Sequence, residues 1–328
     1  ALMLAIGCMG FGGPSVLEPL SLPAPVCGEE QVRIRVEGVS VNYADLQTRR
    51  GSYHAGGTQF PVIPGLDAVG IVETVGSRVD HIRVGQRVLA FPHTGTYAEY
   101  VVADGNLTFP VPEGLPLEQA IACPLVTFTS WMLLHKVAAL EPGETLLIHA
   151  ASGGIGTTVI QMARNLGAAR IIGTVGSPAK RQAALDAGAD DVFCLSDGPF
   201  AAAVLDKTGG RGADVILDSL GGSYTAEGMT CLAPYGRMVA FGNASHAYCQ
   251  VDTGALHASC RSVRGFSIGS TRRMRPAWFG EAAPEVLASL AAGRVKIPIA
   301  ARFPLMEAAG AHELLEQRKV TGKIILEV

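Results

Sequence analysis

The chain has 328 residues, of which 48% are hydrophobic and 17% are charged, and its formal net charge is −3. This length suggests two domains or one large domain with an ample core. The weak net charge and the scattered basic residues argue against a nucleic-acid partner, and no apolar run reaches the length of a membrane span. The apolar start, residues 1–9, lacks the basic region of a signal peptide, and the seven dispersed cysteines form no C-x-x-C pair. We therefore expect a cytoplasmic protein.

The first 120 residues or so contain short β-type runs that are separated by turn residues. In Gln31–Val36 the apolar residues alternate, which places Val32 and Ile34 on one face of a strand. Further strands are expected near residues 1–9, 68–75, 87–91 and 97–102. This pattern predicts a mainly β domain, with a barrel-like arrangement.

From about residue 120 onwards, strand and helix patterns alternate. Strands are expected near 145–149, 170–175, 191–194, 213–217 and 237–241, with residues 262–268 as a candidate sixth strand. Helices are expected near 154–166, 178–187, 199–208 and 223–232. Such alternation is typical of a parallel, doubly wound sheet.

The C-terminal part changes character again. A helix is expected over Pro284–Ala292, an amphipathic segment over Glu307–Arg318, and a closing strand over Lys323–Val328. Met274, Trp278 and Phe279 lie in a segment without a strong regular pattern. We expect the tail to return to the first domain.

A glycine-rich turn at residues 150–156 is the clearest sign of a function. The apolar run Leu146–Ile148 stops there, and a helix pattern follows as far as Leu166. In this layout the backbone amides at the helix start point at the phosphates of a dinucleotide. Ala151 replaces the first glycine of the G-x-G-x-x-G pattern, so an ordinary tight turn is the alternative interpretation.

The residues that follow the second expected strand indicate which nucleotide binds. A site that prefers NAD has an acidic residue there to bind the ribose 2′-hydroxyl. Residues 173–181 contain no acid, and Asp186 lies well into the next helix. Ser177, Lys180 and Arg181 instead offer a hydroxyl and two cations, which suit the 2′-phosphate of NADPH. The alternative is that the two cations only solvate a helix face.

Several motifs together carry a resemblance that covers essentially the whole chain. They are Phe11-Gly-Gly-Pro14, Asn42-Tyr-Ala-Asp45, Gly51-Ser-Tyr53, Pro64-Gly65, Gly85-Gln-Arg-Val88, His149-Ala-Ala-Ser-Gly-Gly-Ile-Gly156, Asp218-Ser-Leu-Gly221 and Phe241-Gly-Asn243. The chain resembles the zinc-free, zeta-crystallin-like quinone oxidoreductase branch of the medium-chain dehydrogenases/reductases. The resemblance implies an α/β protein: a GroES-like β-rich domain, residues 1–122 and 293–328, and a Rossmann domain with a doubly wound parallel sheet, residues 123–292. It also implies a homodimer, with residues 262–268 as the edge strand involved.

The resemblance further implies the positions of the cofactor contacts. Asn42 and Thr127 would lie near the nicotinamide and its ribose. The pyrophosphate would be held by Ser152, Gly153, Gly154, Ile155 and Gly156. The 2′-phosphate would be bound by Gly176, Ser177 and Lys180. The path from adenosine to nicotinamide would be lined by Ser219, Phe241, Gly242 and Asn243. Leu195 stands where some members have a Tyr or His beside the adenine, so adenine stacking is not expected there.

The residues also bear on the reaction, because they depart from the zinc-dependent relatives. Zinc alcohol dehydrogenases of this superfamily have a Cys near the position of Asn42 and a Gly-His-Glu motif, whereas this chain has Gly65-Leu66-Asp67. We therefore expect no metal site. Without a Lewis acid, hydride addition is easier to a conjugated acceptor, whose charge spreads into an enolate that hydrogen-bond donors stabilise. The expected substrates are quinones, enones or enoyl thioesters.

Tyr53 is the candidate catalytic residue. The resemblance implies that a Tyr at this position donates a proton to the enolate or lines the quinone pocket, and its phenol can donate a hydrogen bond at neutral pH. A buried aromatic that anchors its loop is the alternative. Tyr43 and Gln47 are expected to flank the same pocket, while Asp45 is expected to hold the loop as a structural residue.

Three functions follow as hypotheses. The first is an NADPH-dependent, zinc-independent reductase of quinones or α,β-unsaturated carbonyls. Its variant is an enoyl-thioester reductase of lipid or polyketide metabolism. The alternative from another class is an NADPH-binding sensor or structural protein with incidental activity.

Overall fold

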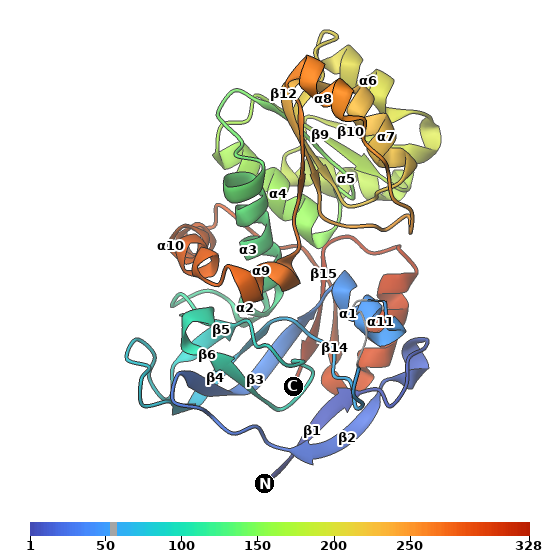
Figure 1. Ribbon diagram of the computed structural model, residues 1–328. Coiled ribbons are helices and arrows are strands. Elements are labelled where there is room, and N and C mark those ends of the chain that lie inside the picture. Colours follow the sequence, from blue (N-terminus) through green and yellow to red (C-terminus); the bar gives the residue numbers. More distant parts are fainter. Residues whose placement is uncertain (53–57) are drawn as a thin grey trace. The chain divides into compact units, whose positions relative to one another are not determined.

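The structure is a computed structural model that describes residues 1–52 and 58–328. The chain forms two compact units (Figure 1). Unit 1 consists of Ala1–Val126 and Pro276–Val328, and unit 2 consists of Thr127–Arg275. The bounds predicted from the sequence are 122/123 and 292/293, so the two divisions differ most at the second crossing.

Unit 1 is mainly β, as the sequence predicts, and its named strands pair antiparallel except for β14 and β15, which are parallel. Its main sheet has the order β14-β15-β3-β4-β5-β7, and β6 also pairs with β3. The strands are β3 (Gln31–Val41), β4 (Ala68–Val75), β5 (Arg87–Ala90), β6 (Tyr100–Asp104), β7 (Thr108–Pro110), β14 (Ile299–Pro304) and β15 (Lys323–Glu327). A separate hairpin pairs β1 (Leu2–Gly7) with β2 (Glu18–Pro23). β15 pairs antiparallel with β3, which confirms that the C-terminal tail returns to the first unit.

Strand β3 organises the core of unit 1. It runs five residues beyond the predicted end because it pairs along its length with β4, β6 and β15. The predicted alternation is confirmed, since Val32, Ile34 and Val36 are all buried in the same cluster. The helices of this unit are α1 (Tyr43–Arg50), α2 (Leu117–Ala122), α10 (Ala277–Ala291) and α11 (Ala308–Glu316), with short turns η1 (Pro14–Val16), η2 (Gly105–Leu107) and η6 (Leu305–Glu307).

Helix α10 corrects the sequence prediction. The helix was expected to begin at Pro284, but it begins at Ala277 and has Pro284 inside it. The segment thought to lack regular structure is therefore helical, and Met274 ends another helix, α9 (Ile268–Met274). The physical reason is packing: Phe279 is buried with its ring 4.8 Å from that of Phe91, and tertiary contacts of this kind outweigh the local cost of a proline.

Unit 2 contains a six-stranded parallel sheet of order β10-β9-β8-β11-β12-β13. The strands are β8 (Thr145–Ile148), β9 (Arg170–Val175), β10 (Asp191–Cys194), β11 (Ala213–Asp218), β12 (Leu232–Ala240) and β13 (Ser262–Gly265). The chain starts at β8, adds two strands on one side, and then adds three on the other. This is the doubly wound order predicted from the sequence, and ligands bind where the order reverses, at the carboxyl end of the first strand.

Helices connect these strands and extend the unit. They are α3 (Pro124–Met132), whose first residues belong to unit 1, the π-type turn η3 (Leu133–Val137), α4 (Gly154–Asn165), α5 (Arg181–Ala187), α6 (Phe200–Lys207), α7 (Ser223–Thr230), α8 (Thr253–Ser259), α9 and the short turns η4 (Pro178–Lys180) and η5 (Leu195–Asp197). Among the described residues, no helix is both long and apolar enough to cross a membrane.

Strand β12 is longer than the sequence predicts. The sequence pattern predicts a helix as far as residue 232 and a strand from residue 237, but the strand begins at Leu232. Tyr235 adopts a left-handed conformation with φ 64°, and the pairing with β11 shifts register between Ala213 and Val215. This irregularity interrupts the apolar run and hides the beginning of the strand from a pattern search.

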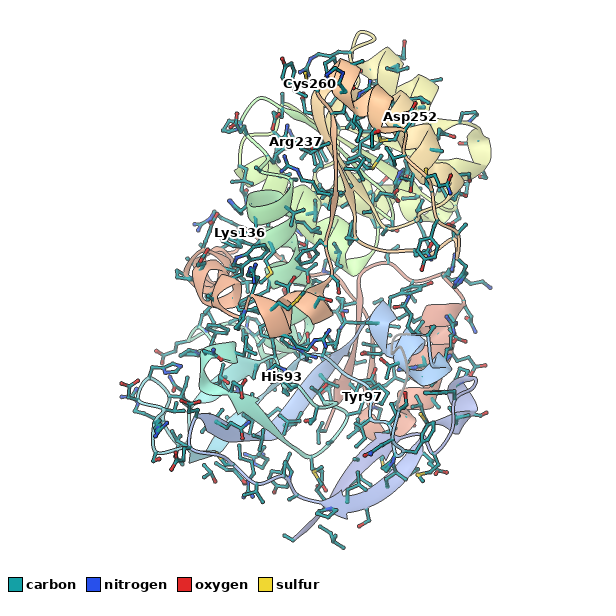
Figure 2. The ribbon with its side chains drawn as sticks, viewed as in Figure 1. His93, Tyr97, Lys136, Arg237, Asp252 and Cys260 are labelled. Carbon is teal, nitrogen blue, oxygen red and sulfur yellow. The ribbon has the colours of Figure 1, made fainter. Side chains whose placement is uncertain are left out.

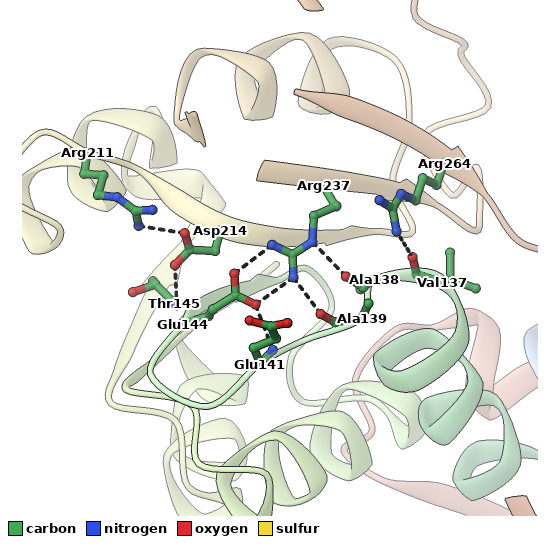
Figure 3. A network of polar contacts seen from close by, with 10 residues as sticks. All are labelled: Val137, Ala138, Ala139, Glu141, Glu144, Thr145, Arg211, Asp214, Arg237 and Arg264. Carbon is green, nitrogen blue, oxygen red and sulfur yellow. Dashed lines mark hydrogen bonds and ion pairs between the residues drawn. The ribbon is translucent and has the colours of Figure 1, made fainter. Parts of the chain in front are cut away.

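An arginine clasp joins the edge of this sheet to the end of η3 (Figure 3). Arg237 of β12 bonds both carboxylate oxygens of Glu144, at 2.7 and 2.6 Å, and also donates to the carbonyls of Ala138 and Ala139. Arg264 of β13 donates to the carbonyl of Val137 at 2.6 Å. The last carbonyls of a helix have no partner within it, and the two guanidinium groups satisfy them here.

Candidate active site

The glycine turn lies at the carboxyl end of β8, as predicted. Ala150 adopts a left-handed conformation with φ 51°, and helix α4 begins at Gly154 with Gly153 as the residue before it. A Cβ at Gly156 would lie 2.3 Å from the carbonyl oxygen of Ala150. The backbone therefore folds so tightly that no side chain fits at this position. The first amides of a helix have no partner within it, and such amides can bind an anion.

The loop after β9 packs against this turn. A Cβ at Gly173 would lie 2.6 Å from the Cβ of Ala151, which fixes how closely β9 approaches the turn. Beyond the strand, Ser177 is extended, Lys180 ends the short turn η4, and Arg181 begins α5. Arg181 forms an exposed ion pair with Asp197 at 3.2 Å. The predicted hydroxyl and two cations therefore lie within one loop that leads from β9 into α5.

The loops after β11 and β12 meet each other. The N–H of Ala244 donates to the carbonyl of Ser219 at 3.0 Å, and a Cβ at Gly242 would lie 2.9 Å from the same oxygen. Phe241 donates its N–H to the carbonyl of Asp218. The structure thus brings Ser219 together with the segment Phe241–Asn243, at the same edge of the sheet as the glycine turn. Thr127, the other predicted contact in this unit, is buried in α3.

The predicted residues of unit 1 gather at the start of α1. Asn42 immediately precedes this helix and is buried, Tyr43 is its first residue and is exposed, and Gln47 follows one turn after Tyr43. Tyr43 and Gln47 therefore share one face of the helix. Tyr53 lies outside the described residues, so its predicted role is not tested by the structure.

Asp45 begins a buried chain of hydrogen bonds. Its Oδ2 accepts the backbone N–H of Asn42 and the hydroxyl of Tyr97, each at 2.9 Å. The Tyr97 oxygen also lies 2.9 Å from Nε2 of His312, and Nδ1 of His312 lies 2.9 Å from Nη1 of Arg49. Arg49 in turn pairs with Glu316. Asp45 therefore caps α1, in agreement with the structural role expected from the sequence, and Tyr97 connects it to α11 (Figure 2).

A second buried set of contacts surrounds Asn42. Nζ of Lys323, the first residue of β15, lies 2.6 Å from Oδ1 of Asn42 and 2.6 Å from the carbonyl oxygen of Val41. Nδ2 of Asn42 donates to the hydroxyl of Ser40 at 3.1 Å. That hydroxyl lies 2.9 and 2.8 Å from the two oxygens of Asp67, which also accepts the N–H of Leu125.

Burial sets the charge states of this region. It raises the pKa of Asp45 to about 7 and raises that of Asp67, although hydrogen bonds and Lys323 oppose the shift. Burial also lowers the pKa of Lys323 to about 8, against the attraction of Asp67 and Asp45. It lowers the pKa of His312 to about 3, with help from the charge of Arg49. His312 is therefore neutral at physiological pH.

Asp67 stands where the zinc-dependent relatives have the last residue of Gly-His-Glu. Both of its oxygens accept hydrogen bonds from Ser40, and one of them also accepts from Leu125. Where those relatives have a cysteine, Asn42 instead binds a lysine ammonium. Within the described part of the chain, no group of three or more His, Cys, Asp or Glu side chains is arranged to hold a metal ion.

Sequence reasoning missed Lys323, Tyr97 and His312. Tyr97 and His312 are 215 positions apart, and Lys323 is 281 positions from Asn42. Their partners meet only after the sheet has formed. The local signal was a lysine directly before the apolar run Ile324–Leu326 of the closing strand, because a charge in a buried strand rarely lacks a partner.

Comparisons with known proteins place the chain in a family. Residues 28–113 match the family model described as the alcohol dehydrogenase GroES-like domain, and residues 154–281 match that described as zinc-binding dehydrogenase. The quinone oxidoreductase of Salmonella typhimurium is 35% identical over 324 residues, which are 96% of each chain. The chain belongs to the quinone oxidoreductase family. This membership confirms the resemblance seen in the sequence, and with it the GroES-like and Rossmann fold.

Two further proteins that are similar to this chain add detail. The solved structure of Escherichia coli quinone oxidoreductase complexed with NADPH is similar to this chain, with a TM-score of 0.90 and 31% sequence identity. The match covers 99% of this chain and 100% of that one. A phenolphthiocerol/phthiocerol polyketide synthase subunit of Mycobacterium tuberculosis is 33% identical over 300 residues, 91% of this chain but 14% of the much longer subunit.

Proposed function

We propose that this protein is an NADPH-dependent, zinc-independent reductase that transfers a hydride to a quinone or an α,β-unsaturated carbonyl. The turn at β8 and α4 is the observation that carries the proposal. Gly156 has no room for a side chain, and the backbone amides at the start of α4 suit a pyrophosphate. The Escherichia coli relative with the same fold is complexed with NADPH.

The residues after β9 favour NADPH over NADH. No acid stands where the ribose 2′-hydroxyl would be bound, while Ser177, Lys180 and Arg181 lie within one loop. A 2′-phosphate accepts charge-assisted hydrogen bonds from such groups. The pyrophosphate would be held by Ser152–Gly156, and the rest of the dinucleotide by Gly176, Ser219, Phe241, Gly242, Asn243, Thr127 and Asn42.

The buried charges of unit 1 support a reaction without zinc. The ammonium of Lys323 binds the side chain of Asn42, and a cation there would repel a second, divalent cation. Bound NADPH supplies the hydride, and the acceptor gains this hydride and one proton. The protein then needs hydrogen-bond donors for the oxygen on which charge develops, which favours a conjugated acceptor. We propose that Tyr53 donates the proton and that Tyr43 and Gln47 line the substrate pocket.

An enzyme assay tests this proposal directly. NADPH and NADH oxidation would be followed with a simple quinone, an aliphatic enone and an enoyl thioester. We expect turnover of NADPH with the quinone or the enone, and loss of enone turnover in Tyr53→Phe. Tight NADPH binding with negligible turnover of every acceptor would instead favour the sensor or structural function.

An enoyl-thioester reductase is the second candidate, because the polyketide synthase subunit is similar to 91% of this chain. This function predicts that the enoyl thioester is the best acceptor of the panel. A kcat/KM for the quinone at least tenfold above that for the thioester would contradict it.

We further propose that the protein works in the cytoplasm as a homodimer. β13 is the edge strand of the parallel sheet, and Arg264 and Gly265 on it are exposed. An edge strand offers unpaired backbone groups to a second copy. Elution as a monomer in gel filtration at micromolar concentration would rule out the dimer.

A further inference from the structure

We infer that Lys323 is a positioning residue that fixes the orientation of the Asn42 side-chain amide for the cofactor. The inference rests on the proposed function, because Asn42 is proposed to contact the nicotinamide ribose. It goes beyond that function by assigning a role to a buried charge at the other end of the sequence.

The orientation follows from the donors and acceptors present. An ammonium group only donates, so the atom of Asn42 that lies 2.6 Å from Nζ of Lys323 must be the amide oxygen. The amide nitrogen then faces Ser40, at 3.1 Å from its hydroxyl oxygen. The Ser40 hydroxyl accepts this bond and donates its own hydrogen to the Asp67 carboxylate. Each member of this series has one consistent role, which Lys323 fixes at the amide oxygen of Asn42 and Asp67 fixes at the hydroxyl of Ser40.

The strength of the constraint comes from charge and burial. Asn42, Ser40, Asp67 and Lys323 are all buried, and hydrogen bonds to charged groups are stronger than neutral ones in such surroundings. The second bond from Lys323, to the carbonyl of Val41, holds the ammonium against the end of β3. Without the ammonium, the amide loses its only charged partner and can turn over, exchanging its oxygen and nitrogen.

The consequence concerns what a ligand meets at this position. An amide oxygen has two lone pairs, and Lys323 uses one of them. The inference requires that the amide oxygen also accept from a hydroxyl group, such as those of the nicotinamide ribose. If the amide turned over, the same hydroxyl would meet the amide nitrogen, and Ser40 would lose its donor. Lys323 therefore acts on ligand binding through Asn42 and makes no contact of its own with the ligand.

A ligand pair separates this role from a structural one. NADPH contains the nicotinamide ribose, whereas adenosine 2′,5′-bisphosphate contains only the half that Ser177, Lys180 and Arg181 of unit 2 are proposed to bind. Dissociation constants for both would be measured by calorimetry on the full chain, with NADPH also followed by its fluorescence. The variant is Lys323→Met/Asp67→Asn, which removes both buried charges together so that neither is left unpaired. Lys319→Met, at an exposed lysine four residues away, is the control.

We expect the double variant to bind NADPH about tenfold more weakly, which corresponds to the loss of one hydrogen bond between the ribose and the Asn42 amide oxygen, and to bind the bisphosphate as the wild type does. Asn42→Ala should show the same loss, and adding the double substitution to it should weaken NADPH binding no further. Lys319→Met should bind both ligands normally.

Three outcomes would overturn the inference: unchanged NADPH binding in the double variant, an equal loss for both ligands, or additive losses when Asn42→Ala is combined with it. Failure of the proposed function is distinguishable, because it shows in the wild-type protein: either NADPH does not bind, or NADPH binds and no acceptor is reduced. If Lys323→Met/Asp67→Asn does not fold, Lys323→Arg decides the question. A guanidinium keeps a hydrogen-bond donor for Asn42, so we expect NADPH binding within threefold of wild type. A tenfold loss that affects NADPH but not the bisphosphate would contradict the inference.

Discussion

The hydroxyl oxygen of Tyr97 lies 2.9 Å from Nε2 of His312, and this contact sets the direction of a buried hydrogen-bond chain. Arg49 can only donate, so Nδ1 of His312 accepts and Nε2 carries the proton. His312 then donates to Tyr97, whose hydroxyl donates to Asp45. Only the neutral tautomer of His312 with its hydrogen on Nε2 satisfies every member.

The first prediction is that acid destabilises the protein through His312. Its pKa is lowered from 6.5 to about 3 in the folded state, so the unfolded state binds more protons between these values. The stabilisation is complete above pH 6.5 and is lost as the pH falls towards 3, by about 3 kcal/mol between pH 7 and pH 4 at roughly 1.4 kcal/mol per pKa unit. Asp45 acts in the opposite direction over this range, because burial raises its pKa to about 7. The part of His312 is therefore measured by urea unfolding at pH 7 and pH 4 as a difference between the wild type and a variant that does not titrate at this position.

Gln provides the matched variant for this prediction, because its amide can accept from Arg49 and donate to Tyr97 without titrating. Relative to the wild type, His312→Gln should be about 3 kcal/mol more stable at pH 4 than at pH 7. The pH dependence from His149, whose pKa burial lowers to about 4, and from Asp45, whose pKa burial raises to about 7, should remain in both proteins. An equally steep pH dependence in His312→Gln and wild type would contradict the assignment.

The second prediction contrasts two glycines of the turn. Gly156→Ala should destabilise the protein by about 1–3 kcal/mol, because the new Cβ would meet the carbonyl oxygen of Ala150 at 2.3 Å. Gly153→Ala meets that oxygen only at 3.4 Å and should unfold within about 1 kcal/mol of wild type, but bind NADPH more weakly, since the backbone there approaches the pyrophosphate. Thermal unfolding and NADPH titration distinguish the two, and normal NADPH binding by Gly153→Ala would contradict the proposed cradle.

The third prediction concerns nucleotide choice. Lys180→Ala should reduce the preference for NADPH over NADH about tenfold, because one charged partner of the 2′-phosphate is lost. The ratio of the two kcat/KM values measures this preference. Lys319→Ala, which removes an exposed lysine elsewhere, is the control and should leave the ratio unchanged. Equal losses for the two nucleotides in Lys180→Ala would mean that the lysine does not recognise the phosphate.

The fourth prediction concerns the arginine clasp of unit 2. Arg237→Met should cost about 2–4 kcal/mol of stability, because Glu144 and two helix-end carbonyls lose their partner in a mostly buried place. Arg87→Met removes an equally bidentate but more exposed pair with Glu37, and should cost less than about 1 kcal/mol. The free energy of unfolding of both variants would be measured by chemical unfolding. Similar losses would show that the clasp stabilises the protein no more than the exposed pair does.

The sequence predicts the fold well where one residue pattern decides one element. The strand at 68–75 has the predicted bounds because its β-type run stops at Gly76, and the glycine turn lies where strand and helix patterns meet. It fails where packing outweighs the pattern. Pro284 suggests a helix start, yet the buried face around Phe279 continues the helix through it.

The candidate site shows the same division. Most of the proposed dinucleotide residues of unit 2 follow their strands directly in sequence, so a local pattern was enough to propose them. The partners of Asn42 and Asp45 could not, since Lys323, Tyr97 and His312 reach them only through strand pairing and helix packing. Residue-type patterns contain no information about such distant contacts until the topology is known.

The order of the elements along the chain has a consequence for synthesis. Unit 2 is continuous in sequence, whereas the sheet of unit 1 needs β14 and β15, which are translated after all of unit 2. A ribosome therefore exposes a complete unit 2 while β3 still lacks its neighbour β15. The unpaired edge of β3 must not pair with a wrong strand before β15 emerges. A stalled or truncated product without β15 would expose this edge to other chains permanently.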